Sequence, residues 1–365
     1  MVSTLAGSGT YGSTDGASGV ASFNWISGET TDGTNLYVVE NCGNTNDIRK
    51  IEIATGMVST LAGSAVYGAA DGTGTAATFG CPWGITTDGN ALYVADSGNR
   101  EIRKIAPSSG SLSAMTSANA VVTTLAGSST NTGAADGAGA TATFNYPNSI
   151  TTDGSHLYVL DTNNNKIRMI APGSGSLSAM TSANAVVTSL TGASGVAATA
   201  GAADGAGATA SFNYPIGITT DGTSLYVADT SNNKIRKIVI ATGEVSSLTG
   251  AAGVSSMSGA ADGAGATASF SSPEDITTDG SHLYVLDTGI NKIRMIAPGS
   301  GSLSAMTSAN AAVSSITGAA NVATTAGAAN GAAGTATFNT PFGITTDGSS
   351  LYVTDETNNL IRKIH

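Results

Sequence analysis

A motif that recurs six times along the chain is the feature that most restricts its fold. The fragment Ile-Thr-Thr-Asp-Gly occurs five times, and a sixth, first copy carries Glu29 in place of the isoleucine. The five copies begin at Ile85, Ile150, Ile218, Ile276 and Ile344. Regular self-similarity is typical of repeat architectures, in which each repeat is one supersecondary unit. We therefore treat residues 1–365 as one domain, although that length would also allow two or three.

Three further fragments recur in register with the first and divide each repeat into four strands. The second reads Leu-Tyr-Val, any residue and then an acid; the third reads Ile-Arg-Lys-Ile or Ile-Arg-Met-Ile; the fourth reads Val-Ser-Thr-Leu-Ala-Gly or a close relative. Their β-branched and aromatic content predicts strands, and the Asp-Gly, Asn-Asn and Thr-Gly pairs between them predict turns. Four short strands per repeat are typical of one propeller blade. The sequence therefore predicts an all-β, six-bladed β-propeller of four-stranded blades.

The order of the fragments predicts how the ring closes. The chain opens with a fourth-strand fragment at about residues 2–7 and ends with three strand fragments from Ile344 to Ile364. We expect the N-terminal segment 1–7 to complete the last blade, which removes two exposed strand edges. The blade repeats are expected at about residues 8–63, 64–127, 128–192, 193–250, 251–318 and 319–365.

Three repeats carry a longer connection between the third and fourth strands, such as 172–180. Its Ser, Gly and Ala content would suit a disordered linker. We favour an ordered surface loop that Leu177 and Met180 attach to the core.

The charge pattern restricts the possible partners. The net charge is -11, which opposes binding to nucleic acids or to anionic membranes. All 14 basic residues lie in or beside the third strand of a repeat, where we expect a ring of blade-to-blade ion pairs. The acids that end the second strand are expected to face the arginine of the third strand, and the Thr-Thr-Asp-Gly acids to accept local backbone hydrogen bonds. No apolar stretch is long enough to cross a membrane, so we expect neither a nucleic-acid partner nor membrane insertion.

The repeat resembles the NHL repeat, and its clearest copy comprises residues 212–218, 225–229 and 233–238. The resemblance extends over essentially the whole chain and implies a six-bladed propeller. It is similar to the exported bacterial branch of these proteins, which implies an extracellular, cell-surface or periplasmic location. The abrupt start at a strand and stop at residues 363–365 lead us to expect a monomeric domain of a larger protein. NHL propellers include protein-binding and RNA-binding modules and a lyase, so the resemblance leaves the activity open. The lyase would need several histidines around a metal, whereas His156 and His282 lie in turns and His365 is terminal.

Two cysteines are predicted to form a disulfide, with two unlinked thiols as the alternative. Cys42 follows the second strand of the first repeat, and Cys81 precedes the first strand of the second repeat. Connections at these two places emerge on the same face of a propeller, in neighbouring blades. The first repeat also has two extra residues there, within 41–46. A disulfide would indicate an oxidising compartment.

The candidate functional residues are those where near-identical repeats differ. Beside the proline that starts the first strand, one position contains Trp25, Cys81, Tyr146, Tyr214, Ser272 and Thr340. Two residues later the series is Ser27, Trp83, Asn148, Ile216, Glu274 and Phe342. We expect both series to converge on a shallow funnel around the central channel and to form a binding surface. Neutral drift at tolerant positions is the alternative.

Three acids also break the repeat pattern near this place, namely Glu29 and the adjacent Glu274 and Asp275. The sequence therefore predicts a non-catalytic binding module with no cofactor, whose ligand-binding residues are Trp25, Ser27, Trp83, Tyr146, Asn148, Tyr214, Ile216, Glu274, Asp275 and Phe342. Its partner would be a protein, a peptide or a glycan. One alternative is a hydrolase or lyase that uses the three acids with a divalent cation in the channel. Another is a purely structural scaffold or spacer.

Overall fold

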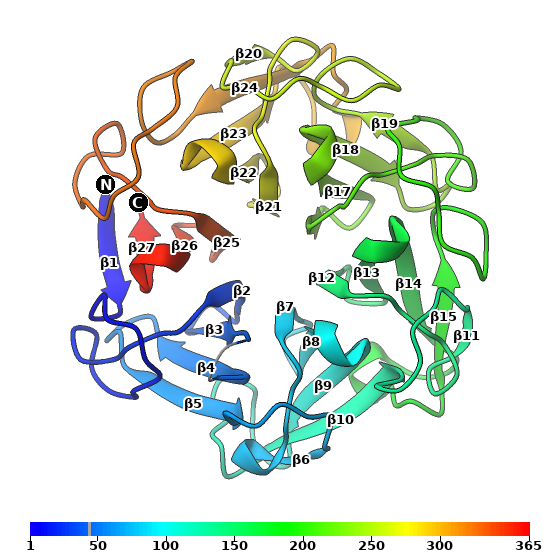
Figure 1. Cartoon of the computed structure of the whole chain (residues 1–365), viewed down its shortest axis with the longest axis vertical. Coiled ribbons are helices and arrows are strands. Elements are labelled where there is room, and N and C mark those ends of the chain that lie inside the picture. The colour runs from blue at the N-terminus through cyan, green and yellow to red at the C-terminus, as the bar shows by residue number, and fades with distance from the viewer. Residues whose placement is uncertain (43–44) are drawn as a thin grey trace.

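The computed structural model describes residues 1–42 and 45–365, and within them six antiparallel sheets surround a central axis (Figure 1). Blade 1 contains β2 (Ile26–Thr31), β3 (Asn35–Glu40), β4 (Asp47–Glu52) and β5 (Val58–Gly63). Blade 2 contains β7 (Pro82–Thr87), β8 (Leu92–Asp96), β9 (Glu101–Pro107) and β10 (Ala120–Gly127). Blade 3 contains β12 (Pro147–Thr152), β13 (Leu157–Asp161), β14 (Lys166–Pro172) and β15 (Ala185–Ser189).

The remaining three blades follow in chain order. Blade 4 contains β16 (Gly217–Thr220), β17 (Ser224–Asp229), β18 (Lys234–Val239) and β19 (Val245–Ser247). Blade 5 contains β21 (Pro273–Thr278), β22 (Leu283–Asp287), β23 (Lys292–Pro298) and β24 (Ala311–Ser315). Blade 6 contains β25 (Pro341–Thr346), β26 (Leu351–Asp355), β27 (Leu360–Ile364) and β1 (Val2–Ala6). The predicted six-bladed propeller is therefore confirmed.

Short elements complete the blades. Blades 2, 3 and 5 have a fifth, two-residue edge strand: β6 (Gly72–Thr73), β11 (Gly137–Ala138) and β20 (Gly263–Ala264). The short 3-10 turns are η1 (Gly74–Ala76), η2 (Ser97–Asn99), η3 (Thr162–Asn164), η4 (Leu177–Ala179), η5 (Thr230–Asn232), η6 (Thr288–Ile290), η7 (Leu303–Ala305) and η8 (Glu356–Asn358). In the described part of the chain, no helix has the length and apolar character that a membrane crossing requires.

The ring closes as predicted, because β1 pairs with β27. The antiparallel register places Val2 opposite Ile364 and Thr4 opposite Arg362. Both ends of the chain therefore lie in blade 6, as their neighbouring labels in Figure 1 show.

The hydrophobic core lies between the blades rather than in one central cluster. One of its clusters joins Tyr93 of β8 to Val159 of β13, and it also includes Leu177 and Met180. These last two side chains are 2% and 1% exposed, so the long connection is an ordered loop, as expected. Each blade thus buries its apolar residues only against its neighbours.

A buried arginine organises each blade, and Arg236 illustrates the contacts. Its guanidinium donates to Asp229 Oδ2 at 2.8 Å and to Asp204 Oδ1 at 2.6 Å. It also lies 5.0 Å from the ring centroid of Phe212. The predicted pairing of second-strand acids with third-strand arginines is therefore present.

The prediction that these ion pairs link neighbouring blades is wrong. The connection that carries Asp204 folds back along the outer strand of its own blade, where Gly205 forms a bridge with Val245. Both acids of the arginine therefore belong to the same blade. Lysines make the cross-blade contacts instead, and they donate to carbonyl oxygens: Lys104 Nζ reaches Met180 O at 3.2 Å.

The aspartate of each Thr-Thr-Asp-Gly turn has a structural role. Asp32 Oδ1 accepts hydrogen bonds from the backbone N–H groups of Thr34 and Asn35 at 2.8 Å and 2.7 Å. Its Oδ2 accepts the hydroxyl of Tyr37 at 2.8 Å. These bonds keep the pKa of Asp32 below its usual value, although burial opposes them. The recurring acids thus stabilise individual turns and the strands within each blade.

Candidate functional site

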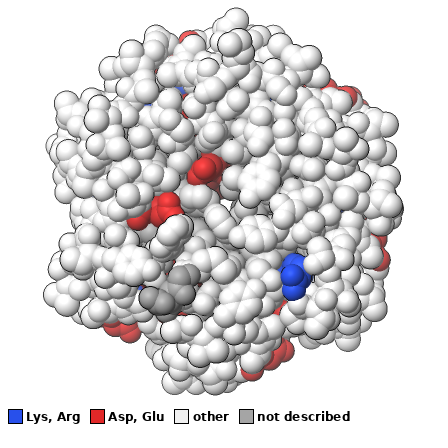
Figure 2. Space-filling view, viewed as in Figure 1, with Lys and Arg blue, Asp and Glu red and all other residues white. Residues whose placement is uncertain are grey.

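The first strand of each blade begins on one face of the ring, which we call the mouth face. Figure 2 shows this face, which is mostly uncharged and carries acidic groups beside the central opening. The variable residues of the sequence analysis lie at the start of these strands. The mouth face is therefore where the six blades differ most.

The residue at the first variable position, which precedes a proline in every blade except blade 1, adopts a left-handed backbone conformation. The φ angles are 49° for Trp25, 49° for Cys81, 57° for Tyr146, 51° for Tyr214, 50° for Ser272 and 52° for Thr340. Side chains other than glycine rarely occupy this region. In several blades an asparagine of the preceding blade stabilises this backbone conformation: Asn165 Oδ1 accepts the N–H of Tyr214 at 2.9 Å. Every blade therefore has the same backbone conformation at this position, whereas the side chain differs between blades.

The second variable series closes the mouth of the channel instead of lining an open funnel. The Trp83 ring lies 5.3 Å from the Phe342 ring and 5.9 Å from the Tyr146 ring, centroid to centroid. Asn148 and Ile216 are buried beside them. A cavity of only about 20 Å³ remains among these side chains. The mouth of the channel is therefore narrower than the shallow funnel that we expected, because aromatic rings from blades 2, 3 and 6 pack together.

Exposed aromatic side chains surround this closed centre. Trp25 is 54% exposed and Tyr214 is 40% exposed, as suits the predicted binding surface. Tyr11 and Tyr67, which the sequence analysis did not select, are 55% and 56% exposed. Both occur at the same place of the connection before the first strand, and this recurrence was the signal that could have identified them. We call Tyr11, Trp25, Tyr67 and Tyr214 the aromatic rim.

A groove lies at one side of the rim, between blades 6 and 1. Tyr11 and Trp25 line it together with Glu356, Thr357 and Asn359 of the turn that follows β26. Its volume is about 250 Å³. This groove offers aromatic, hydroxyl, amide and carboxyl groups to a partner in one place.

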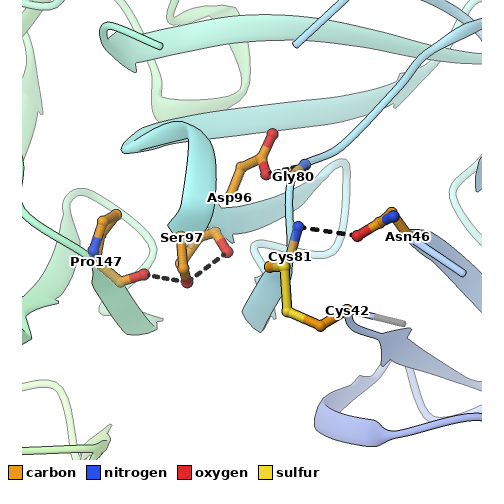
Figure 3. The surroundings of a disulfide bond; sticks show 8 residues. Cys42, Asn46, Gly80, Cys81, Asp96, Ser97 and Pro147 are labelled. Atoms are coloured by element: carbon orange, nitrogen blue, oxygen red, sulfur yellow. Dashed lines mark hydrogen bonds between the residues drawn. A yellow bond between two sulfur atoms is a disulfide. The ribbon is translucent and has the colours of Figure 1, made fainter. Parts of the chain in front are cut away.

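The predicted disulfide joins blades 1 and 2 on the same face (Figure 3). Cys42 and Cys81 are bonded, and their Cα atoms are 4.6 Å apart. The backbone N–H of Cys81 also donates to Asn46 Oδ1 at 2.9 Å. Gly43 and Asn44 belong to the segment 41–46 that contains the two extra residues, and they lie outside the described residues. The bond holds two neighbouring connections of the mouth face together.

Below the mouth, the central channel forms a polar cavity of about 130 Å³. Five isoleucines and Glu29 surround it at one level, and six threonines surround it at the next. Asp275 lines both this cavity and the mouth. The channel therefore contains two carboxyl groups in an otherwise uncharged wall.

Glu29 and Asp275 lie on either side of β25. Asp275 Oδ2 accepts the N–H of Ile344 at 2.8 Å. The carboxyl group of Glu29 lies against Gly343, since a Cβ added to this glycine would come within 2.3 Å of Glu29 Oε2. Glu274 and Glu356 lie nearer the surface. The four acids thus come from blades 1, 5 and 6.

Burial dominates the electrostatics of these acids. It raises the pKa of Glu29 well above 4.5, and repulsion from Asp275 raises it further. Burial also raises the pKa of Asp275 to about 7. For Glu274, burial and the charge of Glu356 raise the pKa to about 8. The shared cause is removal from water without a compensating cation.

Several polar atoms at this site have no hydrogen-bond partner among the described residues. They are Glu29 Oε1 and Oε2, Glu274 Oε2, Asn148 Oδ1 and Nδ2, and Trp83 Nε1. Buried polar groups in folded proteins are almost always hydrogen-bonded. The described residues contain no group of three or more His, Cys, Asp and Glu side chains that is suited to hold a metal ion. The three acids that the alternative hydrolase or lyase would use are therefore near one another but do not form such a group.

Comparison with known proteins agrees with this architecture. No family model matches the chain. It is 31% identical over 166 residues to NHL repeat-containing protein 2 of Homo sapiens, a match that covers 42% of this chain and 21% of the human protein. The chain is a six-bladed β-propeller whose repeats are similar to NHL repeats. The match spans about a fifth of that relative's length, so it describes the repeats and not the whole human protein.

Solved structures share the fold of this propeller at low sequence identity. An auxiliary nutrient binding protein from Bacteroides thetaiotaomicron is 17% identical, with a TM-score of 0.65 over 100% of this chain and 76% of that protein. Virginiamycin B lyase from Staphylococcus aureus is 15% identical, with a TM-score of 0.50 over 100% of this chain and 98% of the lyase. Such similarity demonstrates a common fold, which hosts both binding proteins and enzymes.

Proposed function

We propose that this propeller is a non-catalytic binding module of an exported or cell-surface protein, whose mouth face binds a protein, peptide or glycan. The aromatic rim is the observation that carries the proposal. Large aromatic side chains at 40% to 56% exposure remain in water on one face. Tyrosine and tryptophan are enriched where binding energy is concentrated, because they bury much area at little entropic cost.

Three further observations support this class of function. A disulfide persists in oxidising compartments, which suits an exported protein. The recurrent arginine of each third strand is buried in an ion pair, so these arginines offer no phosphate-binding surface, and Arg100 alone among the described arginines is partly exposed. The structurally similar auxiliary nutrient binding protein has a binding role on the same fold. We also propose that the module acts as a monomeric domain of a larger protein and without a cofactor.

Arrays of defined peptides and of defined glycans test the proposal. We expect the purified protein to bind at least one probe, and the affinity for it to be measured by calorimetry. The double substitution Trp25→Ala and Tyr214→Ala should weaken that affinity at least tenfold. The control Val186→Thr changes an exposed position on β15, away from the mouth face, and should leave it unchanged.

Two results would overturn the proposal. Absence of binding to both arrays would favour a scaffold or spacer. Chemical conversion of a bound probe, detected by mass spectrometry and abolished by a chelator, would favour the metal-dependent hydrolase or lyase.

A further inference from the structure

Acids of two kinds are buried or partly buried in this propeller, and they differ in their partners. The acids that recur in every blade pair with an arginine, as Asp229 does with Arg236 at 2.8 Å. Glu29, Glu274 and Asp275 break the repeat pattern, and no lysine, arginine or histidine lies within ion-pair distance of them in the described part of the chain. Charges that are buried without a partner are costly. The repeat therefore neutralises its structural acids and leaves these others without a counter-ion.

The side chains around these acids form a defined site. Glu29 is 7% exposed and Asn148 is 1% exposed, and the side-chain polar atoms of both lack hydrogen-bond partners in the described structure. Glu29 is among the residues that line the channel cavity, and Asn148 is among those that line the mouth. Buried polar groups that have no partner and lie beside a cavity indicate a partner that comes from outside the fold.

The walls of the mouth suit a positive charge. Trp83 and Phe342 lie next to Glu274 and Asp275 around the same small cavity. Aromatic faces attract ammonium and guanidinium groups, most strongly where water is excluded. Carboxylates and aromatic rings together are therefore complementary to an organic cation.

We infer that the channel mouth binds the side chain of a lysine or arginine that a peptide or protein partner presents. This inference rests on the proposed binding function and names the group that the mouth face recognises. The side chains at the mouth leave only about 20 Å³, so the aromatic rings must move apart to admit a ligand. The thin alkyl stem of either side chain needs a smaller displacement of these rings than a pyranose ring would. The charged end would lie beside Glu29 and Asp275, in the cavity of about 130 Å³.

The affinity should depend on pH. The groups that face the site are Glu29 on β2, Glu274 and Asp275 on β21, and Glu356 on η8. Each has a raised pKa, and burial is the largest cause in every case. A cation prefers the ionised carboxylates, so its binding releases protons. Affinity should therefore increase between pH 6 and pH 9 and then level off.

Ligand-observed NMR with three tripeptides tests the inference. Gly-Lys-Gly and Gly-Arg-Gly carry the cation, and Gly-norleucine-Gly carries an uncharged stem of similar length. We expect the first two to bind at pH 8 and the third to bind at least tenfold more weakly. The double substitution Glu29→Gln and Asp275→Asn should reduce binding of the cationic peptides at least tenfold. Glu244→Gln, on an exposed turn, is the matched control and should have no effect.

The thermal melt of each variant verifies that it is folded. Equal binding of all three tripeptides, tighter binding of glucosamine, or displacement of the peptides by micromolar Ca²⁺ would each overturn the inference. If the rim variants lose binding to an array probe while the carboxyl variants keep it, the proposed function stands and this inference fails.

Discussion

The buried arginine of each blade is the residue on which the repeat most depends. Besides its two acids, Arg236 donates to the carbonyl oxygens of Ala203 and Ser211 at 2.9 Å and 3.0 Å. One guanidinium thus connects two strands of the blade to the connection that crosses its outer edge. Charge-assisted, multiply bonded groups of this kind fix geometry as well as contribute energy. Glu29 has no such partner, and its effect on stability should differ accordingly.

We predict that Glu29→Gln stabilises the protein in a pH-dependent manner. Because burial raises the pKa of Glu29, the folded state binds more protons than the unfolded state above pH 4.5. Wild-type stability therefore falls as pH rises through this range. The variant lacks this penalty, so its advantage should be near zero at pH 4.5 and should grow steadily up to pH 8.5.

Urea unfolding at several pH values measures this difference. Glu244 is exposed, so Glu244→Gln should shift stability by the same small amount at every pH. An advantage of Glu29→Gln that does not grow with pH would show that the carboxyl group carries no buried penalty.

At the level of elements, the first strands of the blades approach one another unusually closely. A Cβ on Gly84 would lie 2.6 Å from Asn148 O, and a Cβ on Gly217 would lie 2.5 Å from Glu274 O. Glycine is needed at these two places because the backbone of the next blade occupies the space of a side chain. The narrow channel follows from this close packing, and the substituted positions, such as Asp275, project into it.

The disulfide should stabilise the contact between blades 1 and 2. Replacing both Cys42 and Cys81 by serine should lower the free energy of unfolding by about 2–4 kcal/mol, because the bond closes a loop over a sequence separation of 39 residues. Guanidinium unfolding with and without a reductant measures it. Reductant should destabilise the wild type to the level of the double variant and leave that variant unchanged. A wild type that resists full reduction without any loss of stability would contradict this account.

The sequence was sufficient to predict strands, blades and the disulfide, because each depends on local pattern or on the fixed faces of a propeller. It could not show that the connection carrying Asp204 folds back along its own blade, so the ion pairs were assigned to the wrong contact. Nor could it show that Trp83 of blade 2 meets Phe342 of blade 6, since this depends on the width of the ring. The exposure of Tyr11 likewise depends on how a glycine-rich connection lies on the surface.

At the scale of the whole molecule, ring closure joins the two ends of the chain without a covalent bond. The N-terminal ammonium of Met1 donates to the carbonyl of His365 at 2.8 Å, and the N–H of His365 donates to Met1 O at 3.0 Å. Val2 is 1% exposed and belongs to the cluster between blades 5 and 6. Since the core is divided among blade contacts, β1 stabilises the contacts on both sides of blade 6.

We therefore predict that deletion of Val2–Ala6 lowers the melting temperature by at least 5 °C, or about 4 kcal/mol or more. The deletion exposes the edge of β27 and removes Val2 and Ala6 from two interblade clusters. Circular dichroism on heating measures the loss. Removal of residues 195–197, an exposed part of a connection, is the control and should change the melt by less than about 3 °C. Added peptide with the sequence of residues 1–7 should restore part of the lost stability by occupying the edge of β27. An unchanged melt after the deletion would mean that blades 1 and 6 hold the ring closed without β1.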